Sequence, residues 1–178
     1  MEIQTSNLLD LIKSRRSVRH FEIQKLTREL IREILECGRW APSKMNNQPW
    51  KVNVVTHPTV RMMLAELSSD GEIIEQAYTI FVVFLDLERA SEDILDYLSI
   101  GAFVENILLA IQSIPDLGGL WIGDIVKNKE KVNEMFKMSQ EKYECVGLIA
   151  FGKIDNELED LNKVPRERRE IDDFIEWY

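Results

Sequence analysis

Apolar side chains recur at helical spacing near the start of the chain. Leu8, Leu11 and Ile12 share one helix face, which predicts a helix over residues 6–15. Thr27 precedes a second apolar face, and its hydroxyl suits the N-cap position of a helix. The chain therefore begins with two amphipathic helices, separated by a short polar segment.

Three later segments have the patterns of strands. Residues 50–54 alternate apolar and polar side chains, which is typical of a strand with one buried face. Residues 78–85 and 145–151 are continuous apolar runs rich in β-branched and aromatic residues. Runs of this kind predict strands that are buried on both faces.

The longest helix is predicted over residues 92–113, where apolar positions cover more than half of the circumference. Such a helix is buried on several sides, and its Gly101-Ala102 pair favours the close approach of another backbone, as at a subunit interface. Shorter helices are predicted at 59–68 and 128–138. Together with the strands, they indicate an α+β fold.

The last part of the chain changes from polar to apolar. Residues 153–165 are predicted to form a charged, irregular connector. The tail beyond it ends in the apolar and aromatic residues Phe174, Ile175, Trp177 and Tyr178. Because a chain this short leaves little core for the tail to cover, we expect it to dock on another subunit.

The composition is that of one acidic globular domain over residues 1–178, with a formal net charge of -9. This charge disfavours nucleic acid and anionic membranes as partners. With no run of 18 or more apolar residues and no secretory pattern at the start, we expect no membrane span and a cytoplasmic location. Cys37 and Cys145 are expected in the core, and His20 and His57 lack metal-ligand spacing, so no metal site is expected.

Two short polar segments carry the candidate chemistry. Residues 15–21 read Arg-Arg-Ser-Val-Arg-His-Phe, and residues 41–50 read Ala-Pro-Ser-Lys-Met-Asn-Asn-Gln-Pro-Trp. Guanidinium groups bind phosphate oxygens two at a time, so a cluster of them in an acidic chain suggests a bound anion. Each segment alone also has an ordinary interpretation, as a solvated helix end or as a plain loop.

In this order and at this spacing, the two segments resemble the flavin-dependent nitroreductase family. That family begins with Arg-x-Ser-x-Arg/Lys-x-Phe and continues one helix later with Ala-Pro-Ser-x-x-Asn-x-Gln-Pro-Trp. Residues 117–123 resemble its second glycine loop, residues 147–152 its last core strand and residues 165–168 its late basic pair. The resemblance therefore covers nearly the whole chain.

The resemblance implies a nitroreductase-like α+β fold, with helices flanking a central mixed β-sheet. It implies an intertwined homodimer whose C-terminal tail docks on the partner subunit, with two active sites at the interface. It also implies that FMN is bound, that NADH or NADPH is the electron donor, and that hydride passes through flavin N5 in a ping-pong cycle. Nitroaromatics, quinones or similar small molecules would be the acceptors. No catalytic side chain is required, because the flavin carries the hydride.

The family motifs also imply which residues bind the cofactor. Its phosphate would be held by the basic and hydroxyl side chains of Arg15, Arg16, Ser17, Arg166 and Arg168. Arg19 matches the family's cation at the pyrimidine edge of the flavin, where negative charge develops on reduction. The loop residues that would reach the flavin from the partner subunit are Pro42, Ser43, Lys44 and Asn46.

Two further segments have more than one interpretation. Residues 48–50 more readily fix the preceding loop to the next strand than contact a cofactor. Gly118, Gly119 and Leu120 would approach flavin N5, since a glycine lets a backbone N–H come close. The same segment also reads as a plain turn after Pro115.

Two other functions remain open from the sequence. The chain could hold flavin without turnover, as a storage protein or a regulator. It could also be a specialised flavin enzyme on the same fold, of the dehalogenase or flavin-destroying type. Such enzymes generally carry extra lid segments, and no long insertion separates Trp50 from Glu92. An open site of broad specificity is therefore favoured.

Overall fold

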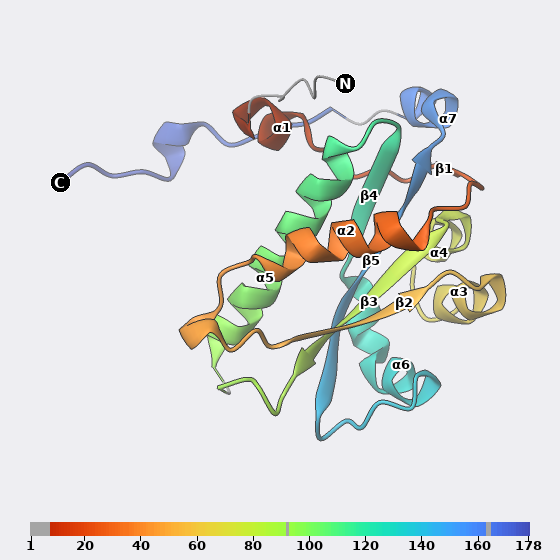
Figure 1. Cartoon of the computed structure of the whole chain (residues 1–178). Helices are drawn as coiled ribbons and strands as arrows, with labels where there is room; N and C mark the ends of the chain where they lie inside the picture. The colour runs from red at the N-terminus through yellow and green to blue at the C-terminus, as the bar shows by residue number, and fades with distance from the viewer. Residues whose placement is uncertain (1–7, 92, 163–164) are drawn as a thin grey trace.

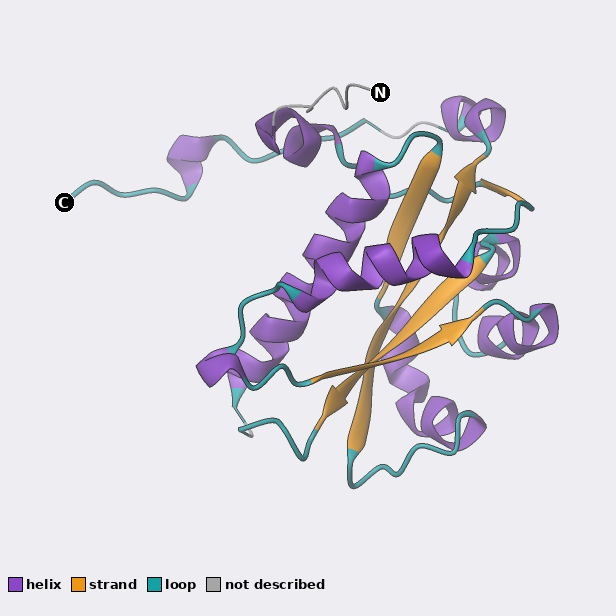
Figure 2. Cartoon of the chain, viewed as in Figure 1, coloured by secondary structure: helices purple, strands orange, loops and turns teal. Residues whose placement is uncertain are grey.

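A five-stranded sheet organises the structure, shown in orange in Figure 2. The computed structural model describes residues 8–91, 93–162 and 165–178. The strands are β1 (Phe21–Glu22), β2 (Trp50–Val55), β3 (Thr79–Asp86), β4 (Leu117–Ile122) and β5 (Tyr143–Ile154). Their order along the sheet is β1-β5-β3-β2, and β4 pairs with β5 as well. The three strands predicted from the apolar pattern are confirmed as β2, β3 and β5.

The sheet is antiparallel, which corrects the predicted mixed sheet. The pairings β1–β5, β2–β3, β3–β5 and β4–β5 are all antiparallel. Among the described residues, the one parallel contact is an isolated bridge between Ser17 and Gly119. A mixed sheet needs a strand that runs parallel to its neighbour, and the described tail, residues 165–178, contributes no strand.

The helices cover both faces of the sheet (Figure 1). One face carries α2 (Arg28–Arg39) and α5 (Ile94–Ser113), which share a core with Phe81 and Val83 of β3. The other face carries α3 (Pro58–Ala65), α4 (Gly71–Gln76) and α6 (Lys129–Met135), packed on Ile80 and Val82. Successive side chains of β3 enter opposite cores, so almost every position along the strand is buried, and this explains its continuous apolar run.

The helix α5 is the longest of the described elements. By length and composition alone, it is apolar enough to cross a membrane. Its inner side instead packs into the core through Phe103, Ile107 and Ile111, as a core helix does. Its first turns expose Ile94 (72%) and Leu98 (61%), so one apolar surface remains uncovered within this chain.

A bulge in β5 requires glycine at position 147. The pairing passes from Val83 opposite Gly147 to Phe84 opposite Cys145, so Val146 is the extra residue. Gly147 has a φ of 150°, and a Cβ there would lie 2.6 Å from Nε1 of Trp121. Both the backbone conformation and the close contact exclude a larger side chain.

Several predicted boundaries and segments differ from the structure. The first helix, α1, spans Leu8–Ser14, and positions 6–7 of its predicted range lie outside the described residues, as does Glu92 of the long helix. Two helices were absent from the prediction, α4 and α7 (Asn156–Leu161). The helix α7 lies within the predicted irregular connector, and positions 163–164 of that connector lie outside the described residues.

The helix α7 has a local cause. The side chain of Asp155 accepts the backbone N–H of Leu158 at 3.1 Å and so caps the first turn. Glu157 and Glu159 then add acidic side chains to that turn, where they complement the helix dipole. The helix within the connector therefore begins with capping chemistry that an apolar pattern does not detect.

The two cysteines differ in environment. Cys145 is fully buried in β5, and burial raises the pKa of its thiol to about 11. Cys37 is exposed, which corrects its predicted place in the core. It lies on the outer side of α2, whose buried residues are Ile31, Ile34 and Gly38.

The C-terminal tail extends away from the body of the chain (Figure 1). It contains one short 3₁₀ turn, η3 (Ile171–Asp173). Beyond this turn, Phe174 is 61% and Trp177 is 90% exposed. An extended tail with exposed aromatic side chains supports docking on a second subunit, which stays a prediction.

Asp116 offers a test of backbone strain just before β4. Its φ of 61° lies in the left-handed region, and its carbonyl accepts the N–H of Ile154 at 2.8 Å. Replacing Asp116 with glycine should raise the free energy of unfolding by about 0.5–1 kcal/mol, since glycine adopts this conformation without steric cost. Chemical denaturation measures the change. Asp116→Ala is the matched control and should destabilise; the same sign for both variants would contradict the argument.

Candidate functional site

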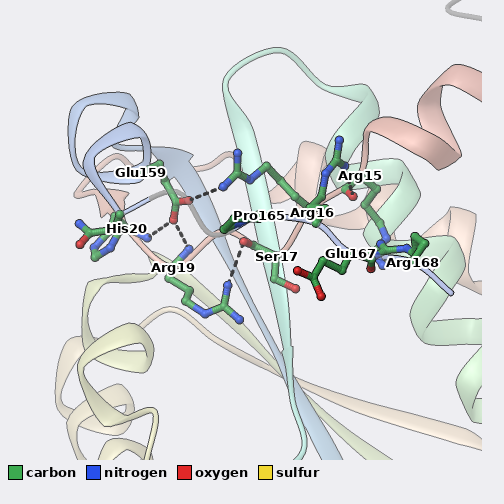
Figure 3. A pocket seen from close by; sticks show the side chains of 11 residues that line it. Arg15, Arg16, Ser17, Arg19, His20, Glu159, Pro165, Glu167 and Arg168 are labelled. Carbon is green, nitrogen blue, oxygen red and sulfur yellow. Dashed lines mark hydrogen bonds and ion pairs between the residues drawn. The ribbon is translucent and has the colours of Figure 1, made fainter.

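A cavity of ≈ 320 Å³ forms where two distant parts of the chain meet (Figure 3). One part follows α1, and the other comprises α7 and the start of the tail. The residues that line it are Arg15, Arg16, Ser17, Arg19, His20, Glu159, Asn162, Pro165, Arg166, Glu167 and Arg168. All six predicted basic and hydroxyl residues from the two ends of the chain are therefore brought together.

The segment after α1 is fixed to the sheet by its buried residues. Val18 is 2% exposed, and its N–H donates to the carbonyl of Gly119 at 3.1 Å. A Cβ at Gly118 would lie 2.4 Å from Cγ2 of Val18, so glycine is needed for this close approach. Since Val18 and Phe21 point into the core, Ser17 and Arg19 are left beside the cavity.

Positive charge dominates the lining, which contains five arginines and two glutamates. Arg15 Nε lies 3.4 Å from Glu105 of α5, and Arg16 lies 3.9 Å from Glu159. Arg19 Nη1 donates to the carbonyl of Ser17 at 3.3 Å. Partly exposed contacts of this kind leave most of the guanidinium donors free for an anion.

Arg166 has a structural contact as well as a place in the lining. Its Nη1 lies within 3.0 Å of the carbonyls of Lys13, Ser14 and Arg15. These carbonyls belong to the last turn of α1 and the residue after it, where they lack helical partners. Arg166 therefore ties the tail to α1. Its predicted bond to a phosphate stays a prediction, to be made through its other nitrogens.

The predicted partner loop lies at the start of α5, whereas α1, which leads into the cavity residues, lies near the other end of that helix (Figure 1). Pro42, Ser43, Lys44 and Asn46 are therefore not brought to the arginines within one chain. Lys44 forms an ion pair with Asp93, the N-cap residue of α5, and its ammonium lowers the pKa of that carboxyl.

Other contacts hold this loop in a strained conformation. Asn47 Nδ2 donates to Asp96 Oδ1 at 2.9 Å, and Asp96 is fully buried. Met45, Asn46 and Gln48 all have φ between 49° and 58°. Left-handed backbone at three non-glycine residues costs energy and is typical of functional loops.

Residues 48–50 fix the loop to the sheet, as the structural interpretation predicted. The carbonyl of Pro49 accepts the N–H of Asp86 at 2.8 Å. The ring of Trp50 stacks on Phe103, with centroids 5.0 Å apart. These contacts connect the start of β2 to β3 and α5.

The predicted glycine loop is wrong, because residues 117–122 form strand β4. Gly118, Gly119 and Leu120 pair with Gly152, Phe151 and Ala150 of β5. Gly118 and Gly119 contact Val18, which lies between the cavity residues Ser17 and Arg19. A contact between residues 118–120 and a cofactor stays a prediction.

Sequence reasoning missed Glu159. Its side chain is 12% exposed, and its Oε1 accepts the backbone N–H groups of Arg19 and His20, the second at 2.8 Å. Glu159 stands in an acidic stretch, Asp155 to Asp160, in which no spacing distinguishes it from its neighbours. Only the folding of α7 onto residues 16–20 brings it to the cavity.

Comparison with known proteins points to one family. A sequence model of the Nitroreductase family matches residues 12–77. The assigned NAD(P)H nitroreductase YdgI of Bacillus subtilis is 26% identical and covers 98% of this chain and 99% of its own. A Desulfovibrio desulfuricans protein, assigned as a nitroreductase and solved in complex with FMN, has 30% sequence identity and a TM-score of 0.86. That match covers 96% of each chain.

A further solved structure shares the fold at lower identity. The NADPH:FMN oxidoreductase of Vibrio harveyi, complexed with NAD+, aligns with a TM-score of 0.85 at 22% identity. The alignment covers 97% of this chain and 77% of that one. Nearly the whole described chain therefore has a counterpart in this fold.

Proposed function

The chain belongs to the nitroreductase family, and on this premise we propose that it is an FMN-dependent NAD(P)H oxidoreductase. The observation that carries the proposal is the arginine-lined cavity between the two ends of the chain. Its acceptors would be nitroaromatics, quinones or similar small molecules. A cytoplasmic location belongs to the same proposal.

The cavity residues fit the phosphate end of FMN. A phosphate monoester carries a charge of about −1.5 to −2 at pH 7 and three strong acceptor oxygens. Arg15, Arg16 and Arg168 offer forked donors of matching charge, and the Ser17 hydroxyl adds another donor. Their positive charge needs a compensating anion in an otherwise acidic protein, and the phosphate supplies it.

The remaining residues would place and polarise the flavin. When bound, FMN supplies the hydride and electron transfer between nicotinamide and acceptor. Arg19 reaches the cavity beside Ser17, where its guanidinium would face the flavin's pyrimidine edge. The protein's part is therefore binding, orientation and electrostatic support, and no side chain acts as a nucleophile.

The proposal includes a homodimer in which each site is completed by the partner. The loop of residues 42–46 does not line the cavity of its own chain, because it lies at the start of α5, whereas α1 lies near the other end of that helix (Figure 1). Exposed Ile94 and Leu98 of α5, and exposed Phe174 and Trp177 of the tail, supply apolar surface for an interface.

Sedimentation of the purified protein at micromolar concentration tests the dimer. The expected mass is twice the 20.8 kDa of one chain. Truncation before Ile171, which removes the exposed aromatic tail, should weaken the association because it removes apolar contact area. A monomer that still binds FMN would contradict the shared site.

Flavin reduction tests the function itself. Purified protein incubated with FMN should retain a flavin spectrum after gel filtration, and that spectrum should bleach anaerobically on addition of NADH or NADPH. Retained colour without bleaching would favour a flavin-binding protein without turnover. Protein that takes up no FMN would contradict both.

A further inference from the structure

Glu159 is a carboxylate set among the arginines of the cavity (Figure 3). It comes from α7, and its Oε1 accepts two consecutive backbone N–H groups, from Arg19 and His20. Its Oε2 lies 3.9 Å from Nη2 of Arg16. The side chain is only 12% exposed, so solvent screens this charge less than it would a surface carboxylate.

The groups that hold Glu159 are those that hold anions in general. Successive backbone N–H groups form a concave anion site, and a guanidinium adds a charged fork of donors. Here an internal carboxylate takes that position. A dianionic ligand entering the cavity must share Arg16 with Glu159, and it also meets the repulsion of a fixed negative charge.

We infer that Glu159 is a specificity-determining residue, which sets how strongly the cavity prefers a phosphorylated flavin over the same flavin without phosphate. The inference rests on the proposed function. Glu159 weakens the attraction of the arginines for the phosphate and leaves an uncharged ligand almost unaffected. The cavity is thereby tuned to release FMN more readily than its arginines alone would allow.

The test compares FMN with riboflavin, which lacks the phosphate. In Glu159→Gln, the amide oxygen can still accept the N–H groups of Arg19 and His20, while the charge is lost. The ratio of the riboflavin to the FMN dissociation constant should rise about three- to tenfold. This magnitude fits one charge acting over several ångströms in a partly solvated site.

Glu157→Gln is the matched control. Glu157 lies on the same short helix, is exposed and does not line the cavity. The variant removes the same charge from the chain and should leave the ratio within twofold of wild type. An equal rise in the ratio for both variants would mean that overall charge, and not the position of Glu159, is responsible.

Glu159→Ala is a second variant, and its ratio of dissociation constants does not depend on how much of the protein stays folded. It removes both the charge and the acceptor, and it should raise the ratio even where part of the protein unfolds, because both flavins report on the same folded fraction. A ratio unchanged in both Glu159 variants, or equal weakening of both flavins, would overturn the inference. Wild-type protein that binds neither flavin would contradict the proposed function as well.

Discussion

Replacing Arg15 with alanine should weaken FMN binding by roughly 10- to 150-fold. This range corresponds to the ~1.5–3 kcal/mol that a hydrogen bond to a charged group contributes. Arg15 lines the cavity, and its ion pair with Glu105 is too exposed to compete strongly with a phosphate. Arg168→Ala should act in the same direction with a smaller effect, because Arg168 is exposed. Fluorescence titration of the apoprotein with FMN measures both.

Arg32→Ala is the control for this experiment. Arg32 is an exposed residue on α2 that does not line the cavity, and its replacement removes the same charge. Its FMN affinity should stay within twofold of wild type. If Arg15→Ala and Arg168→Ala also kept wild-type affinity, the arginines would face solvent in the functional protein and the phosphate site would lie elsewhere.

Much of the fold could be predicted from the sequence, because burial follows the apolar pattern. The run over residues 78–85 is a strand with both faces buried, and Thr27 caps α2 by accepting the N–H of Leu30. Two of the elements that were missed, α7 and β4, depend on short-range polar chemistry and on strand pairing. The helix α7 depends on one Asp155 cap, and β4 depends on pairing with β5.

The glycines of β4 explain one error in detail. Gly118 and Gly119 suggested a loop, because residues 117–123 resemble the family's second glycine loop and also read as a turn after Pro115. In the structure, Gly118 makes room for Val18, whose backbone bonds to β4. The reason for glycine is therefore the close approach of another chain segment, and that segment lies far away in the sequence.

The residues of the candidate site also fall into those that could be predicted from the sequence and those that could not. The arginines at both ends of the chain could be predicted, because their motif and charge distinguish them in an acidic protein. Glu159 could not, because its role arises only when α7 folds onto residues 16–20. The bond from Arg166 to the end of α1 was equally hidden, since it joins residues about 150 positions apart.

Arg19→Gln should lower the midpoint potential of bound FMN by tens of millivolts. Reduced flavin carries negative charge at its pyrimidine edge and oxidised flavin does not, so a cation there stabilises the reduced form. A differential stabilisation of ~1.4 kcal/mol corresponds to about 30 mV for a two-electron couple. Arg19 lines the cavity and is steadied by the carbonyl of Ser17. Arg19→Lys keeps the charge and should change the potential less.

Anaerobic potentiometry, together with FMN titration, separates the possible roles of Arg19. A lower potential with nearly unchanged FMN affinity is the expected result, and reduction by NADH or NADPH should slow in parallel. An unchanged potential with weaker FMN binding would instead assign Arg19 to the phosphate. Arg32→Gln, a matched change on α2 away from the cavity, should alter neither quantity. If Arg19→Gln behaved like this control, Arg19 would have no part in the site and would be an ordinary solvent-exposed residue beside Ser17.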